Sequence, residues 1–208
     1  MPHPDNMILL FGMPRSGTTW VGKVFDSHPD VHYRHEPDTH LLLNEIVPMF
    51  AELGDTERYA PGLREYCETQ LAVCSSKICG NGKQFPKNYA SNWASWLQRV
   101  RINLNRNLER VSGKKRYWHA AIPVGSERLA WKSIESLGRL GVLLEAIPSC
   151  HAIVIMRNPC GHIASVLRGE ASGKFLTTRA ADDFDLFRML LNTEYGLKSG
   201  LTLEAVSY

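Results

Sequence analysis

Residues 7–20 read MILLFGMPRSGTTW. Five apolar residues lead into a turn bounded by Gly12 and Gly17, and the residues after the turn suit the start of a helix. The first backbone N–H groups of a helix have no partner within the helix, and the helix dipole adds partial positive charge at that end. The stretch therefore predicts a strand, a loop and a helix whose first turn binds an anionic group such as a phosphate.

The spacing of the two glycines matches the Walker A loop of nucleotide-binding proteins, but the position of the charge does not. Four residues separate Gly12 from Gly17, as in that loop, whereas Thr18 stands where the lysine is required. The cation is Arg15, which lies inside the loop. A Walker A lysine reaches the β- and γ-phosphates of the nucleotide. The loop is therefore predicted to bind a phosphate-like ligand other than ATP.

A second stretch with the same layout lies near the other end of the chain. Residues 152–156, AIVIM, predict a buried strand, and residues 161–168 predict a helix. Arg157 stands at the carboxyl end of that strand, and a guanidinium group binds phosphate oxygens through two parallel hydrogen bonds. Taken singly, Arg157 and Ser165 are typical surface residues, but their combination after an apolar strand favours a second phosphate-binding position.

The two stretches together resemble the sulfotransferases, enzymes that use 3′-phosphoadenosine 5′-phosphosulfate (PAPS) as the sulfuryl donor. The string PRSGTTW, residues 14–20, resembles their 5′-phosphosulfate loop, and Arg157 with Ser165 eight residues later resembles their 3′-phosphate site. The resemblance covers residues 7–40 and 129–168. It implies that the following residues bind the donor: Arg15, Ser16, Gly17, Thr18, Thr19, Trp20, Arg157 and Ser165.

The resemblance also implies a reaction. An acceptor hydroxyl or amine attacks sulfur in line, and adenosine 3′,5′-bisphosphate leaves. By analogy with phosphoryl transfer, the protein contributes positioning and electrostatic stabilisation. Arg15 is expected to hold the phosphosulfate and to stabilise the charge that builds on the leaving phosphate. Fixed cations perform the neutralisation, so no metal is expected.

Lys132 and Glu36 are the other candidate catalytic residues. Lys132 ends a predicted strand over residues 129–132 and would stabilise the transferring group, with a structural cation as the alternative. Cytosolic small-molecule sulfotransferases continue from this lysine to a threonine and a catalytic histidine, whereas this chain continues with Ser133 and Ile134. The chain therefore resembles the carbohydrate, protein-tyrosine and bacterial sulfotransferases more closely than the cytosolic type with a histidine base.

Glu36 is the candidate general base. It lies in HPDVHYRHEP, residues 28–37, which resembles the stretch after the first helix in carbohydrate and protein-tyrosine sulfotransferases. A carboxylate close to the acceptor takes the hydroxyl proton if the hydrogen-bond geometry allows it. The alternative for Glu36 is an ion pair with Arg34 or a turn cap. The other candidate bases are three histidines: His35, His40 and His119.

The order of predicted elements indicates an α/β fold with a parallel sheet flanked by helices, P-loop-like, with a helical insertion at about residues 41–128. Residues 1–208 are expected to form a single domain. Ligands bind such sheets beyond the carboxyl ends of the strands, where Arg15, Lys132 and Arg157 are all expected. Strands are predicted at 7–11, 31–33, 129–132 and 152–156, and helices at 18–27, 62–74, 133–147 and 161–168.

The middle of the chain contains one strongly periodic segment. Helical spacing connects seven apolar residues and predicts a long amphipathic helix: Trp93, Trp96, Leu97, Val100, Leu104, Leu108 and Val111. Four arginines share the segment, and Lys114, Lys115 and Arg116 follow it. These cations are interpreted as a solvated face, with an anionic-acceptor surface as the alternative. The insertion as a whole is expected to shape the acceptor pocket or a subunit contact.

Composition favours a soluble cytoplasmic protein. The 208 residues are 44% hydrophobic with a formal net charge of +3, which suits an anionic ligand without indicating nucleic acid. The apolar run near the amino terminus is too short for a signal peptide or a membrane span. Five cysteines without a C-x2-C pair favour reduced thiols over disulfides or zinc: Cys67, Cys74, Cys79, Cys150 and Cys160.

The carboxyl-terminal part is expected to be incomplete. Residues 182–198 have helical spacing, and residues 203–208 begin like a strand and stop. In the sulfotransferases such a strand precedes further helices and a basic loop. Two other functions stay open: a nucleotide kinase or NTPase with a degenerate P-loop, and a non-catalytic nucleotide-binding protein. The acceptor is equally open among small molecules, carbohydrates and peptides, and so is the oligomeric state.

Overall fold

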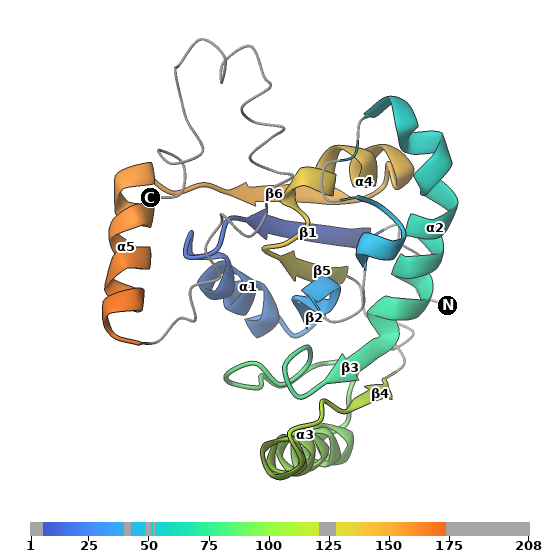
Figure 1. Ribbon diagram of the computed structural model, residues 1–208. Helices are drawn as coiled ribbons and strands as arrows, with labels where there is room; N and C mark the ends of the chain where they lie inside the picture. The colour runs from blue at the N-terminus through green and yellow to red at the C-terminus, as the bar shows by residue number, and fades with distance from the viewer. Residues whose placement is uncertain (1–5, 40–42, 49–50, 52, 121–127, 174–208) are drawn as a thin grey trace. The chain divides into compact units, whose positions relative to one another are not determined.

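The computed structural model describes residues 6–39, 43–48, 51, 53–120 and 128–173. The chain divides into two compact units, residues 1–158 and residues 159–208, and each unit is described by itself. The first unit contains the sheets and most of the helices drawn in Figure 1. The single domain expected over residues 1–208 stays a prediction.

A parallel sheet of four strands organises the first unit, which confirms the predicted α/β fold (Figure 1). The strands run in the order β2-β5-β1-β6. In register, Leu10 lies beside Lys132, and Gly12 lies beside Ile155. The carboxyl ends of all four strands therefore lie along one edge of the sheet. The strands are β1 (Met7–Gly12), β2 (Val31–His35), β5 (Arg128–Ser133) and β6 (His151–Ile155).

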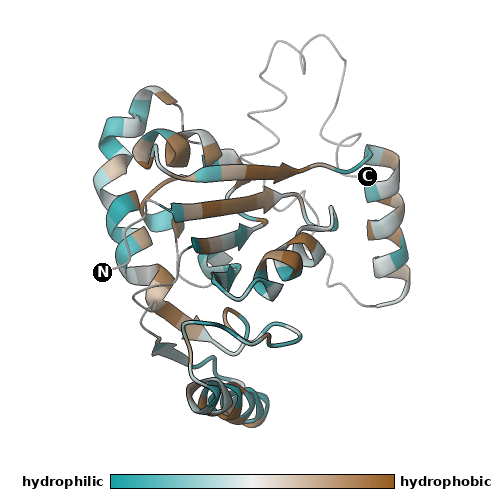
Figure 2. Cartoon of the chain, turned by 180° about the vertical axis from the view of Figure 1, so that it is seen from behind, coloured by the Kyte–Doolittle hydropathy of each residue, from teal (hydrophilic) through white to brown (hydrophobic). Residues whose placement is uncertain are grey.

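All six residues of β1 are buried. Because successive strand side chains point to opposite sides, both faces of this strand are covered. Ile8 and Leu10 pack with Val21 and Phe25 of α1 (Thr18–Ser27), the helix predicted over the same residues. Phe11 and the β1 side chains on the same face as Phe11 belong to the larger core. That core also contains side chains of α2 (Thr56–Thr69) and α4 (Leu140–Ala146). Helices thus flank the sheet on both sides, and apolar colour marks β1 in Figure 2.

The middle of the chain is only partly helical. Besides α2 it contains α3 (Asn92–Ser112) and an antiparallel pair of short strands, β3 (Val73–Ser75) and β4 (Tyr117–His119). Helix α3 has a serine N-cap and a glycine C-cap, as amphipathic helices commonly do. It lies beside β3 and β4, away from the four-stranded sheet (Figure 1). Short 3₁₀ turns occupy Pro37–Thr39, Leu43–Glu45, Leu53–Asp55, Gln70–Ala72 and Leu137–Arg139.

Two predicted elements differ in extent. The helix predicted over 62–74 spans Thr56–Thr69 instead, because residues 73–75 pair with β4 as a strand. The helix predicted over 133–147 begins only at Leu140, after a 3₁₀ turn. Its start is delayed because the Ser133 hydroxyl accepts hydrogen bonds from the backbone N–H groups of Glu135 and Ser136.

The strand predicted as buried over 152–156 is exposed, which corrects that prediction. β6 stands at the end of the strand order, and Ile153 and Val154 are 38% and 44% exposed. An apolar composition indicates a strand but does not determine whether both of its faces are covered.

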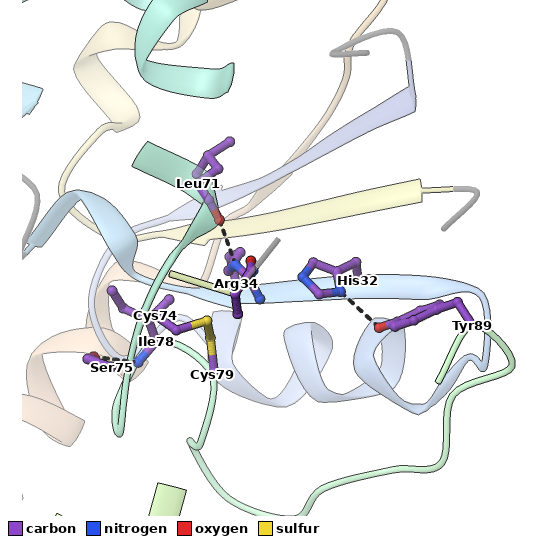
Figure 3. Close-up of a disulfide and its surroundings, with 9 residues drawn as sticks. His32, Arg34, Leu71, Cys74, Ser75, Ile78, Cys79 and Tyr89 are labelled. Atoms are coloured by element: carbon purple, nitrogen blue, oxygen red, sulfur yellow. Dashed lines mark hydrogen bonds between the residues drawn. A yellow bond between two sulfur atoms is a disulfide. The ribbon is translucent and has the colours of Figure 1, made fainter. Parts of the chain in front are cut away.

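The prediction of reduced cysteines is wrong for two of the five. Cys74 and Cys79 form a disulfide, shown in Figure 3, whereas Cys67, Cys150 and Cys160 remain thiols. The turn after β3 brings the two Cα atoms to 5.7 Å, within the usual range for this bond. The C-x4-C spacing matches no common metal motif, so the sequence alone gave no reason to pair them.

Helix α5 (Pro159–Ala171) is the described element of the second unit, and it includes the helix predicted over 161–168. Ser165 is buried on this helix. The elements predicted over 182–198 and 203–208 lie outside the described residues. Among the helices that the structure describes, none combines the length and apolar content needed to cross a bilayer.

Candidate functional site

The loop between β1 and α1 is shaped by its two glycines. A Cβ atom at Gly12 would lie 2.5 Å from the Ile155 carbonyl oxygen and 2.8 Å from Thr18 Cγ2, so only glycine fits there. Gly17 caps α1 with a φ of 101°, a left-handed conformation that glycine adopts freely. The loop therefore passes close to the end of β6 and places the start of α1 at the edge of the sheet.

Donor groups gather at this loop. The Ser16 hydroxyl is buried and has no hydrogen-bond partner, although buried hydroxyl groups normally have one. Thr18 is buried in the first turn of α1, whereas Thr19 and Trp20 are exposed. Because the first amides of a helix lack internal acceptors, the loop offers an unpartnered hydroxyl next to a helix amino terminus. This arrangement suits an anion, as the sequence predicts.

The structure brings Arg15 and Arg157 together from opposite ends of the chain. The Arg157 Nη1 atom donates a hydrogen bond of 3.0 Å to the backbone carbonyl oxygen of Arg15. Both residues are exposed and follow the carboxyl ends of neighbouring strands. Arg157 is therefore attached to the backbone of the β1–α1 loop at the residue that carries the other predicted guanidinium group. Ser165, the predicted companion of Arg157, lies on α5 in the second unit, and its role stays a prediction.

A buried ion pair joins β2 to β5 farther along the same edge. The Lys132 ammonium donates to Oε1 of Glu36, and the Glu36 backbone N–H donates to the Lys132 carbonyl oxygen at 2.8 Å. The Lys132 side chain is 1% exposed and that of Glu36 is 8% exposed. Lys77 completes the cluster, with its Nζ atom 2.8 Å from Oε2 of Glu36. The structure therefore brings together two of the three predicted catalytic residues, Lys132 and Glu36, and adds a second lysine.

The two lysines determine the protonation of the carboxylate. Burial alone would raise the pKa of Glu36, but the hydrogen bonds from Lys132 and Lys77 outweigh it and lower this pKa to about 2. Burial lowers the pKa of Lys132, and the hydrogen bond to Glu36 opposes that shift. Glu36 is thus ionised at neutral pH, the form that a general base requires, but its carboxylate binds protons weakly.

His35 packs beside this cluster. Its Nδ1 atom lies 2.9 Å from the Tyr33 hydroxyl, and its Nε2 atom lies 2.7 Å from Nδ2 of Asn81 and 3.8 Å from Oε1 of Glu36. Burial lowers the pKa of His35 to about 4, so the ring is neutral at pH 7. Of the other candidate bases, His119 is exposed on β4, in the antiparallel pair, and His40 lies outside the described residues.

Backbone strain marks the same edge of the sheet. Among the described residues other than glycine, positive φ angles occur at Arg15, 66°, and at Glu36, 47°. A side chain in this region of φ is unfavourable, and such strain concentrates at functional sites. Both strained positions coincide with residues that the sequence selects for their chemistry.

Sequence reasoning missed Lys77 and Asn81. Both belong to the segment that follows β3, where Cys74 and Cys79 form the disulfide. The His35 backbone N–H donates to the Ile78 carbonyl oxygen at 3.0 Å, which attaches this segment to the end of β2. Lys77 is about forty residues from Glu36 in the chain, so no local spacing could have indicated the contact. The edge thus combines the β1–α1 loop with its unpartnered Ser16 hydroxyl, two arginines, and a carboxylate held by two lysines.

One comparison with known proteins identifies a match. A model described as the Sulfotransferase family matches residues 7–190, well over half of the chain. No curated protein and no solved structure matches.

Proposed function

The chain belongs to the sulfotransferase family, and on that premise we propose that it moves a sulfuryl group from PAPS to a hydroxyl or amine of an acceptor. Family membership supports sulfuryl transfer in general. The observation that carries the choice of donor is the β1–α1 loop, in which a buried, unpartnered Ser16 hydroxyl and a helix amino terminus lie next to Arg15. An ATP-type loop would carry a lysine at position 18.

The residues present fit a phosphosulfate. Gly12 allows the loop to approach the end of β6 closely, and the hydroxyl of Ser16 is a donor that still requires an acceptor. Arg15, Ser16, Gly17, Thr18, Thr19 and Trp20 would hold the 5′ end of the donor. Arg157 and Ser165 would hold its 3′-phosphate, because a guanidinium group suits phosphate oxygens.

The bound donor supplies an activated sulfuryl group whose leaving group is a phosphate. The acceptor oxygen forms a bond to sulfur while the bond from sulfur to the bridging phosphate oxygen breaks, and the electron pair of that bond remains on adenosine 3′,5′-bisphosphate. Arg15 and Lys132 stabilise the charge that builds on the leaving phosphate. Glu36 receives the proton that the acceptor loses.

Because the pKa of Glu36 is low, its role as a base depends on both lysines, Lys132 and Lys77. A carboxylate with a pKa of about 2 accepts a proton efficiently only after one of its two cations moves away. We infer that Lys132 exchanges Glu36 for a phosphate oxygen of the donor, which raises the pKa of Glu36 as the transition state forms. Lys77 then keeps the carboxylate in place.

The acceptor class and the cellular compartment complete the proposal. A small molecule, a carbohydrate or a peptide would each present a suitable hydroxyl, and no metal is proposed as part of the reaction. A cytoplasmic location is the proposal from sequence, but the Cys74–Cys79 disulfide favours an oxidising compartment, because cytosolic thiols are kept reduced.

The first experiment is a thermal-shift titration with adenosine 3′,5′-bisphosphate and, separately, with ATP plus magnesium. A ligand that binds only the folded state raises the melting temperature by mass action. Stabilisation by the bisphosphate alone is expected. Stabilisation by ATP with magnesium alone would favour a nucleotide kinase instead. Binding of the bisphosphate without any turnover of PAPS across a broad acceptor panel would favour a non-catalytic nucleotide-binding protein.

Two arginine variants test the assignment of the two ends of the donor. Arg157→Ala should weaken donor binding chiefly, whereas Arg15→Ala should reduce turnover more than donor affinity, because only Arg15 is proposed to stabilise the reacting end. Arg168→Ala is the matched control, since this arginine is exposed in the last turn of α5. Unchanged donor affinity in Arg157→Ala would remove the 3′-phosphate assignment.

A further inference from the structure

Helix α3 turns its apolar side away from the protein. The seven apolar residues with helical spacing are all between 39% and 89% exposed: Trp93, Trp96, Leu97, Val100, Leu104, Leu108 and Val111. Their spacings of three and four residues place them on one side of the helix. A helix on the surface of a water-soluble domain normally has the opposite orientation, with the apolar stripe buried. This stripe, which we call the outer stripe of α3, therefore requires a partner.

The opposite side of α3 makes the contacts with the rest of the first unit. Ile102 lies two residues from Val100 and Leu104, a rotation of about 200° on a helix. It is 2% exposed and packs with Cys74 and Trp118. Arg106 Nη2 donates to the Gly80 carbonyl oxygen at 2.8 Å, and the Glu109 carboxylate accepts from the Ser76 hydroxyl. Because these contacts fix the rotation of α3, the outer stripe does not turn inward.

Positive charge surrounds the outer stripe. Residues 92–116 contain seven cationic side chains and one acidic side chain, which is more net positive charge than the whole chain carries. Arg101 lies on one side of the stripe, where it stacks on Trp118, and Arg99 and Arg110 lie on the other side, both exposed. Lys114, Lys115 and Arg116 follow the end of the helix.

We propose that α3 docks the protein on an anionic lipid surface, with the outer stripe in the interface and the flanking cations against the lipid headgroups. Helices that lie in the plane of a membrane have this composition, with tryptophan and leucine on one side and arginine or lysine beside them. Long cationic side chains at the borders of such a stripe reach the headgroups while their stems stay on apolar surface. Trp93 and Trp96 stack on each other at the amino-terminal end, and tryptophan is enriched at membrane–water interfaces.

Charge argues against a second copy of the chain as the occupant. Two outer stripes packed face to face would bring the arginines of one copy close to those of the other, and Glu109, the single acidic residue of the segment, is already held by Ser76 and by the backbone N–H of Arg116. Like charges at close range oppose association. An anionic surface is complementary to the whole segment. The proposal concerns a surface in the first unit and does not depend on the proposed sulfuryl transfer.

The test is vesicle co-sedimentation of the full chain with phosphatidylcholine vesicles and with vesicles containing about 30% phosphatidylserine. Binding to the anionic vesicles is expected, with little binding to the neutral ones and a decrease at high salt. The double variant Leu104→Ser/Leu108→Ser should reduce the partition coefficient at least about tenfold. The variant Lys114→Gln should reduce it about fivefold.

The control is Val24→Ser, which replaces an apolar residue that is 50% exposed on α1 and should bind vesicles as the unaltered chain does. Equal binding by the double variant, or no binding to anionic vesicles, would overturn the proposal. Light scattering in solution provides the other decisive result. A dimer that the same double substitution dissociates would show that a second copy covers the outer stripe, and would also overturn it.

Discussion

The carboxyl edge of the four-stranded sheet and the outer stripe of α3 reverse the usual distribution of polarity in opposite ways. At the sheet edge, Lys132 and Glu36 are charged and almost completely buried. On α3, large apolar side chains face solvent. Burying charge and exposing apolar surface are both unfavourable in isolation. The Lys132–Glu36 pair is satisfied within the chain, and the anionic ligand is proposed from the unpartnered Ser16 hydroxyl nearby, whereas the outer stripe of α3 is the basis for proposing a lipid surface.

The difference between the regions lies in where their stability comes from. The sheet edge is held by contacts within the chain, so changes there should affect folding and function together. The outer stripe contributes little to folding, so changes there should affect association alone. Four experiments test this contrast, from the largest expected effect to the smallest.

Lys132→Met should have the largest effect, a loss of about 3–5 kcal/mol in the free energy of unfolding, because it leaves the buried Glu36 carboxylate with one lysine. Turnover should fall by about two to three orders of magnitude. The double variant Lys132→Met/Glu36→Gln is the sharper test, since it removes both charges of the pair. Urea unfolding should show recovered stability with turnover still lost. A double variant no more stable than the single one would contradict the ion-pair interpretation.

Acid should destabilise the protein through His35. The folded state lowers the pKa of this histidine from 6.5 to about 4, so unfolding takes up a proton between these values. Stability is complete above about pH 6.5 and should fall toward pH 4, by on the order of 3 kcal/mol for His35 alone. His32, whose pKa burial also lowers, adds to the loss in the same range.

The measurement is urea unfolding at several pH values, compared with His35→Gln. The variant should show a flatter dependence of stability on pH in this range, whatever its absolute stability. Parallel curves for the two proteins would mean that His35 is not neutral when folded. Glu36 acts at lower pH, because its pKa falls from 4.5 to about 2 and its contribution disappears as the pH falls through that interval.

Reduction of the Cys74–Cys79 disulfide should have an intermediate effect. The bond closes a short loop, so its loss should lower the free energy of unfolding by about 2 kcal/mol in the chain-entropy account. Lys77 lies within that loop, and its contact with Glu36 should weaken as the loop gains freedom. The pair Cys74→Ser and Cys67→Ser separates the bond from general thiol effects, because Cys67 is free and buried. Equal sensitivity of both variants to dithiothreitol would contradict the prediction.

The smallest effect is expected on the outer stripe of α3. Leu104→Ala should change the free energy of unfolding by less than about 0.5 kcal/mol, because the side chain is 57% exposed. Ile102→Ala, on the inner side of the same helix, should cost about 2–4 kcal/mol. Thermal unfolding of the two variants compares the sides directly. Similar losses would mean that the outer stripe is packed in the folded protein.

The sequence predicts the strand, loop and helix at the amino-terminal end well because the signals there are local. The apolar run of β1, the glycines of the loop and the start of α1 are contiguous, and the structure has them at the predicted residues. Arg15 and Arg157 were expected at one edge because parallel strands end together. Lys132 and Glu36 were each selected, but their ion pair was not, since almost a hundred residues separate them and periodicity carries no information about such contacts.

The remaining differences come from tertiary context. Periodicity predicts that α3 has two sides but not which side meets the protein, so the cations were interpreted as a solvated face although Arg106 contacts Gly80. The odd cysteine count and the absence of a C-x2-C pair favoured free thiols. Composition could not reveal that β3 and its turn bring Cys74 and Cys79 together. The same turn brings Lys77 into contact with Glu36, and the sequence could not indicate this contact either.

At Arg15, the left-handed backbone lowers the stability of the fold, whereas the side chain is proposed to serve the reaction. A glycine would adopt a φ of 66° without the steric penalty of a side chain, which is of order 1 kcal/mol. Replacement by glycine should therefore raise the melting temperature while removing the cation from the loop. Selection for thermostability alone would favour that change and, under the proposed role of Arg15, reduce turnover. Variants designed for higher thermostability should therefore keep Arg15 and carry their substitutions at other positions.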